Sequence, residues 1–319
     1  MFILIEVLLM IVVLAGGVGA ARFLQGVVQV VPQQQITTIV NTGDDRNFYG
    51  LHVSPDIDIV MYTLAGIVDE TQGWGIRNDT YDTMQQLTSY GHEDWFRLGD
   101  RDLATHIHRS QLLQQGKSLS EVTDDLRVRL GLELRVLPMS DQPVATHIQT
   151  PVGLLHFQEY MVKRHCSDEV QDVLFRGASE ARPAPGVLDA LKAADAILIA
   201  PSNPIVSIGS ILAIPGVHDV LHEASGMIVA VSPIVGGAPI KGPADKLMSG
   251  MGMEVSAAGV TRCYRDFLDV MVIDNQDAHL ADAIEDLGIP TVVTNTIMRD
   301  NASKAALART VLEAAGLKF

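Results

Sequence analysis

The chain has 319 residues, of which 47% are hydrophobic and 19% are charged, and this length suggests about two domains or one domain with an insertion. Such a composition is that of an ordinary globular protein, so disordered and fibrous classes are excluded. Lys and Arg number 23 against 38 Asp and Glu, and the resulting formal charge of −15 argues against a protein that coats nucleic acid or an anionic membrane.

The apolar N-terminal run predicts a buried strand rather than a targeting signal. It contains Glu6, lacks a basic start, and is shorter than the ~20 residues that span a bilayer. We expect residues 10–15 to form the first strand and residues 1–9 to be a dispensable leader, with Met10 as an alternative start. Two cysteines without metal-ligand spacing, Cys166 and Cys263, fit a reducing, cytoplasmic location.

Short β-rich runs then alternate with helical stretches, a pattern that predicts an α/β fold: a Rossmann-like, doubly wound, mainly parallel sheet. The predicted strands are Ile11–Leu14, Ile36–Val40, Ala196–Ala200, Ile228–Val231, Val270–Ile273 and Thr291–Thr294. Each is followed by a polar or Gly/Pro-rich loop. Because ligands bind outside the carboxyl ends of parallel strands, we expect these loops to face one common site.

The stretch between the second and third predicted strands has a different pattern of predicted secondary structure, mostly helical. Helices are predicted at Ser54–Gly66, Thr80–Tyr90 and Ser118–Leu130, and a β-hairpin at Thr146–Gln149 and Leu154–Gln158. We therefore predict a nucleotide-binding core of residues 10–54 and 183–319. Residues 55–182 would form an inserted, mostly helical subdomain with a β-hairpin that walls off or caps the crevice.

A glycine turn follows the first predicted strand and precedes a predicted helix. Gly16, Gly17 and Gly19 would let backbone N–H groups approach a phosphate at the helix N-terminus. Arg22 stands where a dinucleotide fingerprint has its third glycine, and the second strand ends in Asn41 rather than an acid, so a nicotinamide enzyme is disfavoured. Arg22 would add a cation beside the phosphates; the alternative is a tight turn that binds nothing.

Two carboxylates follow the second predicted strand. Asp44 and Asp45 supply the hard oxygen ligands that suit magnesium, which usually takes one or two carboxylates and shares substrate phosphates with them. The alternatives are an Asx turn over Asn41 to Asp44 and a helix N-cap at Asp56.

The remaining loops add candidate ligand-binding residues, and motifs that are absent exclude several enzyme classes. Ser202 and Asn203 follow the third predicted strand and could contact a phosphate or a base edge. Arg97 precedes the charged run Gly99–Asp102, which is either a salt-bridged surface turn or a segment that binds substrate. No P-loop, nucleophile elbow or zincin motif occurs, which leaves a nucleotide-sugar or nucleotide-diphosphate ligand and phosphoryl transfer.

Taken together, these stretches resemble the 2-phospho-L-lactate transferase family, which builds the deazaflavin coenzyme F(420). The resemblance runs in order from Met10 almost to the C-terminus. It is carried by Gly16-Gly17-x-Gly19, Asn41-Thr42-x-x-Asp45, Ser54-Pro55-Asp56-x-Asp58, Trp74–Thr80, Leu98–His106, Leu137–Asp141, Pro201–Pro204, Val231–Ile234 and Gly242–Leu247.

The resemblance implies that the 5′-hydroxyl of the deazaflavin precursor Fo attacks the β-phosphorus of a guanosine-diphospho donor and releases GMP. The transferred group is phospholactyl, or phosphoenolpyruvyl or phosphoglyceryl in some relatives, and the sequence does not choose among them. The resemblance also implies that Asp58 and Arg97 contact Fo, and that magnesium is required. Gly16, Gly17, Gly19, Ser202 and Asn203 would hold the guanosine diphosphate portion.

We assign the metal to Asp45 and Asp44, and we name Asp45 and Asp58 as catalytic residues. Asp58 would orient the nucleophile, accept its proton, or only bind Fo. The expected partners are the two small-molecule substrates, without nucleic acid or membrane, in a homodimer. The alternative is a non-catalytic regulator of the same fold that binds nucleotide-sugars such as UDP-N-acetylglucosamine; Trp74–Thr80 and Leu98–His106 favour the transferase.

Overall fold

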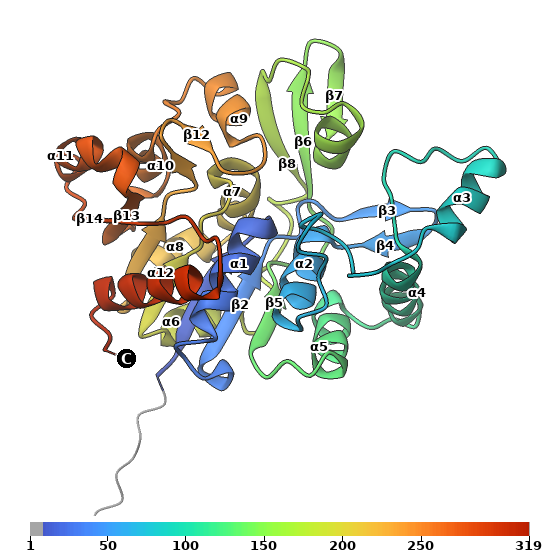
Figure 1. Cartoon of the computed structure of the whole chain (residues 1–319), viewed down its shortest axis with the longest axis horizontal. Coiled ribbons are helices and arrows are strands. Elements are labelled where there is room, and N and C mark those ends of the chain that lie inside the picture. The colour runs from blue at the N-terminus through green and yellow to red at the C-terminus, as the bar shows by residue number, and fades with distance from the viewer. Residues whose placement is uncertain (1–8, 319) are drawn as a thin grey trace, which may run out of the picture.

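The computed structural model describes residues 9–318, and Figure 1 shows one central sheet with helices on both faces. All neighbouring strands of the sheet are parallel, in the order β14-β13-β10-β9-β1-β2-β5. These strands are β1 (Ile11–Ala15), β2 (Ile36–Val40), β5 (Arg135–Pro138), β9 (Ala196–Ile199), β10 (Met227–Val231), β13 (Val270–Asp274) and β14 (Thr291–Thr294). The predicted α/β class and parallel sheet are confirmed.

The apolar side chains of β1 alternate between two cores. Ile11, Val13 and Ala15 pack in one core with α1 (Gly17–Val27), α2 (Pro55–Leu64), α5 (Leu119–Arg129) and α12 (Asn301–Ala314). Val12 and Leu14 pack in the other with α6 (Val187–Ala193), α7 (Gly209–Leu212), α8 (Val217–His222), α9 (Ala244–Gly250) and α10 (Ala257–Tyr264). Strands covered on both faces read as continuous apolar runs, as β1 does.

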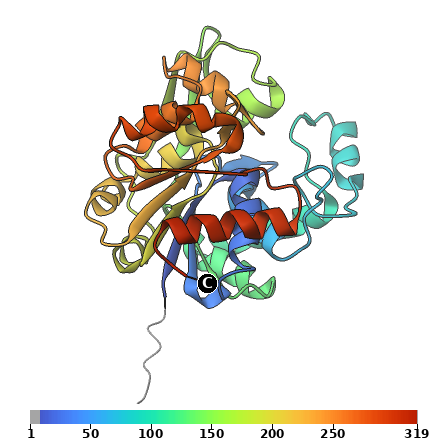
Figure 2. The ribbon, with the colours of Figure 1, turned by 60° about the vertical axis from the view of Figure 1, so that its left-hand side comes forward.

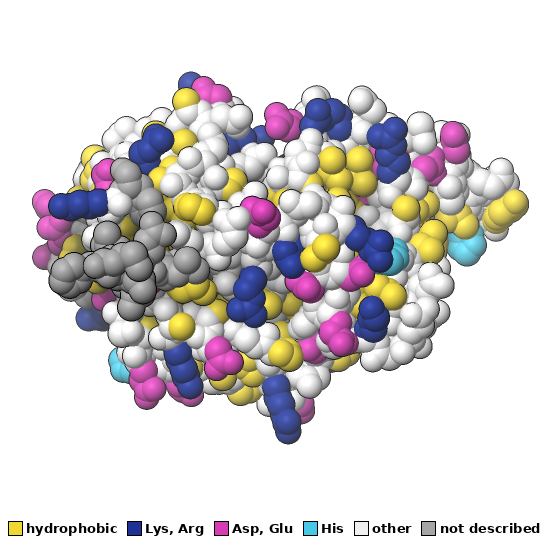
Figure 3. Space-filling view, turned by 90° about the horizontal axis from the view of Figure 1, so that it is seen from below, with side chains coloured by type: hydrophobic (Ala, Val, Ile, Leu, Met, Phe, Trp, Pro, Cys, Tyr) yellow, Lys and Arg dark blue, Asp and Glu magenta, His cyan; other side chains and the backbone are white. Residues whose placement is uncertain are grey.

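Smaller units surround the sheet. A third core joins the hairpin of β3 (Arg46–Phe48) and β4 (Leu51–Val53) to α3 (Asp82–Ser89) and α4 (Asp100–Gln114), which lie at the right of Figure 1. The other elements are β6 (Ala145–Thr150), β7 (Gly153–His156), β8 (Asp172–Arg176), β11 (Ile234–Val235), β12 (Ala238–Pro239) and α11 (Ala281–Glu285). Acidic and basic side chains are interspersed on the face in Figure 3.

One part of the predicted domain division needs correction. The range 55–182 contains β5, which pairs with β2 in the main sheet, and α2 and α5, which pack in one of its two cores. The range is therefore not wholly an insert, although whether its remainder acts as a capping subdomain stays a prediction. The predicted hairpin is present as β6 and β7, and the predicted leader lies, except for Leu9, outside the described residues.

Candidate active site at the carboxyl ends of the central strands

The glycine turn between β1 and α1 packs directly against the loop that follows β9. The Gly16 N–H donates a hydrogen bond to Ser202 Oγ (3.2 Å). A Cβ added to Gly19 would lie 2.2 Å from the Pro201 carbonyl oxygen, so no larger residue fits there. Gly17 has a φ of 70°, in the left-handed region that favours glycine. The first and third predicted loops therefore meet.

The turn after β2 joins the same place. Asn41 Nδ2 donates to Asp56 Oδ2 (2.9 Å), while Asn41 Oδ1 accepts from Gly43 N (2.7 Å) and from Ser210 Oγ (2.6 Å). Asp56 lies in the first turn of α2, and its Oδ2 would be 2.9 Å from a Cβ on Gly16. Asn41 thus ties β2, α2 and α7 together beside the glycine turn. The predicted convergence of loops on one site is confirmed for these three.

Three carboxyl groups are buried around this junction. Burial, and then the charge of Asp56, raise the pKa of Asp44 well above its ordinary value. Burial also raises the pKa of Asp56 to about 7, against the hydrogen bond from Asn41. The pKa of Asp45 is raised by burial too, although His52 and Ser54 oppose the shift. A bound cation would relieve this concentration of acid groups.

The hydrogen bonds of the twin aspartates leave one oxygen of each carboxyl group without a partner. Asp45 Oδ2 lies 2.9 Å from His52 Nε2 and accepts from Ser54 Oγ at 2.7 Å. The Oδ1 atoms of Asp44 and Asp45 are buried and have no hydrogen-bond partner. Within residues 9–318 no group of three or more His, Cys, Asp or Glu side chains could hold a metal ion. The donor set fits magnesium, which needs only one or two carboxylates when substrate phosphates complete its shell.

Asp58, two residues after Asp56 in α2, lies in a buried charged network. Both of its carboxylate oxygens accept from the Arg109 guanidinium, which has no exposed surface. His106 Nδ1 lies 3.2 Å from Arg109 Nη1, and His106 Nε2 lies 3.2 Å from Asp102 Oδ1. Tyr62 OH donates to the same Asp102 oxygen (2.8 Å). The network locks α2 to α4 and fixes the rotamer of Asp58.

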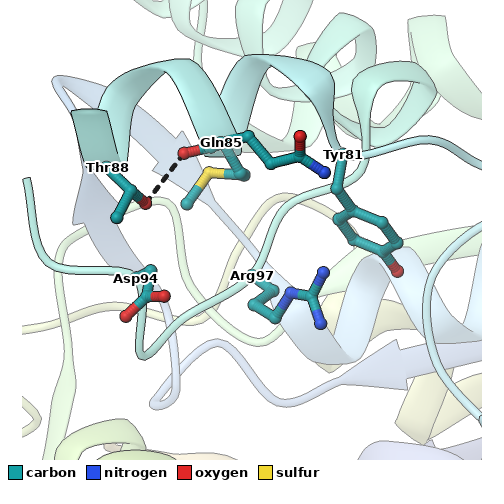
Figure 4. Close-up of a pocket in the computed structure, with 6 residues that line it drawn as sticks. Tyr81, Gln85, Thr88, Asp94 and Arg97 are labelled. Carbon is teal, nitrogen blue, oxygen red and sulfur yellow. Dashed lines mark hydrogen bonds between the residues drawn. The ribbon is translucent and has the colours of Figure 1, made fainter. Parts of the chain in front are cut away.

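Arg97 lies in a separate hollow beside α3. The cavity has a volume of about 120 Å³ and is lined by Tyr81, Met84, Gln85, Thr88, Asp94 and Arg97. The Arg97 guanidinium carbon lies 4.4 Å from the centre of the Tyr81 ring, and Figure 4 shows the two side chains next to each other. Among the described residues no hydrogen bond or ion pair joins Arg97 to Asp58. Their predicted shared contact with one substrate stays a prediction.

Asn203, in the loop after β9, has a structural role of its own. The Asn203 side chain accepts from the N–H groups of Ile205 and Val206 (3.0 and 3.3 Å) and so caps the helical turn Pro204–Ile208. Its Nδ2 is buried without a partner. Asn203 can therefore still donate one hydrogen bond to a ligand.

Two members of the site were missed by sequence reasoning. Asp56 is predicted as a helix cap and as part of a family motif, whereas Ser54 holds the cap position and Asp56 faces the glycine turn. Arg109 was not considered at all. Arg109 lies on the buried face of α4, three residues after His106. A buried arginine needs an anionic partner, and this requirement was the signal that could have identified it.

The chain was compared with known proteins. Residues 11–311 match the model of the family described as 2-phospho-L-lactate transferase CofD. A phosphoenolpyruvate transferase of Streptomyces griseus is 48% identical over 311 residues, covering 96% of this chain and 98% of the relative. A 2-phospho-L-lactate transferase of Methanosarcina mazei is 41% identical over 303 residues, covering 95% of this chain and 99% of the relative.

Solved structures support the fold. A crystal structure of a UPF0052 family protein from Bacillus halodurans aligns with a TM-score of 0.65 and 13% identity, covering 95% of this chain and 98% of the other. Among residues 9–318 no helix combines the length and apolarity needed to cross a membrane.

Proposed function

This chain belongs to the 2-phospho-L-lactate transferase CofD family, and from that premise we propose the reaction and substrates of a transferase of the phospholactate or phosphoenolpyruvate type. The acceptor would be the 5′-hydroxyl of the deazaflavin Fo, and the donor a guanosine-diphospho compound. The hydroxyl oxygen forms a bond to the β-phosphorus while the bond from that phosphorus to the bridging oxygen breaks. GMP leaves with the electron pair, and the hydroxyl proton passes to solvent or to a carboxylate.

The junction of the glycine turn, Ser202 and Asn41 supports this proposal most directly. It presents the N-terminus of α1 beside Ser202, and the next residue, Asn203, keeps an unpartnered Nδ2. Phosphoryl transfer depends on positioning and charge neutralisation more than on covalent help from the protein. The site can hold a diphosphate still with main-chain N–H groups.

Magnesium would be held by Asp44 and Asp45 through their unpartnered Oδ1 atoms, with Asp56 close by. When bound, the ion would neutralise charge that develops on the diphosphate. His52 and Ser54 keep the Asp45 carboxylate in one orientation. Asp58 is proposed to orient the Fo hydroxyl, because the two hydrogen bonds from Arg109 hold its carboxylate in one orientation.

The proposed acyl group is enolpyruvyl. The Streptomyces relative named phosphoenolpyruvate transferase is 48% identical, against 41% for the Methanosarcina relative named 2-phospho-L-lactate transferase, at nearly equal coverage. A cytoplasmic location and a homodimer are further parts of the proposal. They await fractionation and a measurement of mass in solution.

The test is to incubate the purified chain with magnesium, Fo and each of the three donors, and to measure GMP by chromatography. We expect the enolpyruvyl donor to release GMP fastest. If another donor releases GMP fastest, only the proposed identity of the transferred group changes. The proposed enzyme is wrong if no donor releases GMP and UDP-N-acetylglucosamine raises the melting temperature. That result would favour the non-catalytic regulator of the same fold.

Asp45→Asn tests the metal assignment. The amide keeps the size of the side chain and loses its charge, so we expect kcat to fall at least about tenfold while the fold is kept. Asp141→Asn is the matched control, since that carboxylate accepts hydrogen bonds from Ser120 N and Oγ on α5 (2.7 Å each). Equal kcat values in the two variants would remove Asp45 from the proposed metal site.

A further inference from the structure

A second hollow lies beside α1, and of the residues that line it only Arg22 has a role in the sequence analysis. Its volume is about 190 Å³, and it is lined by Val18, Arg22, Gln25, Ile59, Thr63, Val68, Glu70, Gly73, Arg299 and Lys304. These residues come from α1, from α2 and the segment after it, and from the start of α12. Figure 2 shows α12 lying beside α1.

The lining is cationic in a protein of formal charge −15. Arg22, Arg299 and Lys304 line the hollow, and Glu70 is the one acid among its lining residues. Across residues 9–318 no carboxylate forms an ion pair with any of these three cations. Cations gathered without ion-pair partners repel one another, and a bound anion would relieve that repulsion.

Lys304 gives the strongest indication that a bound ligand balances the positive charge of the hollow. Its residue is only 7% exposed. Its ammonium donates to two neutral oxygens, Gln25 Oε1 (2.7 Å) and Asn301 Oδ1 (3.4 Å). Asp300, next to it in sequence, uses its carboxylate to cap α12 through Ser303 N (2.8 Å). The carboxylates of Glu70 and Asp300 act on Lys304 only from beyond ion-pair distance, and burial still lowers the pKa of its ammonium, so an anion that reaches this group would stabilise it.

A fourth cation lies next to Gly73, one of the residues that line the hollow. Lys241 follows β12, and its Nζ lies 2.6 Å from the place where a Cβ on Gly73 would stand. Gly73 lines the hollow and has a φ of 72°, so the absent side chain leaves space for the ammonium. Burial, and then the charge of Arg22, lower the pKa of Lys241, as expected of cations held close together.

We propose that this hollow is a binding site for a small anion that carries a phosphate group, held by Arg22 and Lys304 with Arg299 and Lys241 at its rim. Guanidinium groups bind phosphate through paired N–H bonds, and ammonium groups bind it as point charges. Val18, in the first turn of α1, places one end of the hollow near the glycine turn. The phosphate could therefore belong to a free metabolite or to the nucleotide donor, and the shared chemistry is a phosphate dianion.

The test is binding by calorimetry, with the full chain and without turnover, at constant ionic strength. The probes are inorganic phosphate and GDP, and the variants are Arg22→Gln and Lys304→Gln. We expect each variant to weaken phosphate binding about tenfold, the loss that one charge-assisted hydrogen bond predicts. Arg129→Gln, which removes an exposed cation on α5, is the control and should bind as the unmodified chain does.

The two probes distinguish the sources. If phosphate and GDP compete and both weaken in Arg22→Gln, the hollow holds a phosphate of the donor. If the variant weakens the binding of phosphate but not that of GDP, the hollow is a site separate from the donor site. Unchanged phosphate affinity in both variants would overturn the proposal, and Arg299→Gln, at an exposed position, replaces Lys304→Gln if that variant does not fold. GMP release is not measured, so this outcome is independent of the proposed reaction.

Discussion

Replacing Arg109 by methionine should destabilise the fold severely, because the substitution leaves the Asp58 carboxylate buried without its cation. The Arg109 side chain has no exposed surface, and that of Asp58 is 7% exposed. Removing one partner of a buried ion pair costs about 3–5 kcal/mol. Since whole domains are stable by about 5–15 kcal/mol, this loss would be a large share of the total.

The measurement is urea denaturation at pH 7, followed by circular dichroism and tryptophan fluorescence, with coincident transitions as the test of two-state unfolding. Arg129→Met is the matched control. Arg129 also pairs with an aspartate, Asp125, but its side chain is 63% exposed, so we expect its unfolding midpoint to stay unchanged.

A double variant separates lost charge pairing from lost packing. Adding Asp58→Asn to Arg109→Met removes the uncompensated charge, so about 1–3 kcal/mol of the loss should return. Equal destabilisation by Arg109→Met and Arg129→Met would refute the reasoning. If the double variant recovers nothing, the cost lies in packing and the network does not hold Asp58 by charge.

Two further predictions concern the site itself. Gly19→Ala should cost about 1–3 kcal/mol in the free energy of unfolding, because its Cβ would meet the Pro201 carbonyl oxygen at 2.2 Å; an unchanged melting temperature would contradict this close packing. Asp56 should make the free energy of unfolding fall as pH rises from about 4 to about 7. Its pKa is about 7 in the folded chain and 3.8 when unfolded, so only the folded chain keeps the proton in that window. Asp56→Asn should flatten that part of the urea-measured pH curve, and an unaltered slope would show that the group titrates normally.

The parts of the fold that local pattern encodes were predictable. Six of the seven strands of the main sheet are apolar runs that end in turn residues, and Ser118 caps α5 with Glu121 three residues later. Strand β5 was missed because its residues, Arg135–Pro138, begin with an exposed arginine and end in proline, so they do not form a continuous apolar run. Its place in the sheet depends on pairing with β2, which sequence alone does not display.

The candidate site was predictable to the same extent. Glycines and acids at strand ends identified the glycine turn and the twin aspartates, because those positions follow from the rule for parallel sheets. Arg109 and the orientation of Asp56 could not be predicted, since their partners lie 51 and 15 residues away on other elements. Such contacts come from the packing of α2 against α4 and β2.

The order of strands around β1 also has a consequence for synthesis of the protein. The hydrogen bond from Gly16 to Ser202 joins residues 186 positions apart. At ~5–20 residues per second, a ribosome reaches Ser202 about 10–40 s after Gly16. For that interval β1, whose five residues are all buried in the finished protein, has no β9 beside it and presents a bare apolar edge. A product that terminates before β9 would keep this apolar edge exposed, and exposed strand edges promote aggregation.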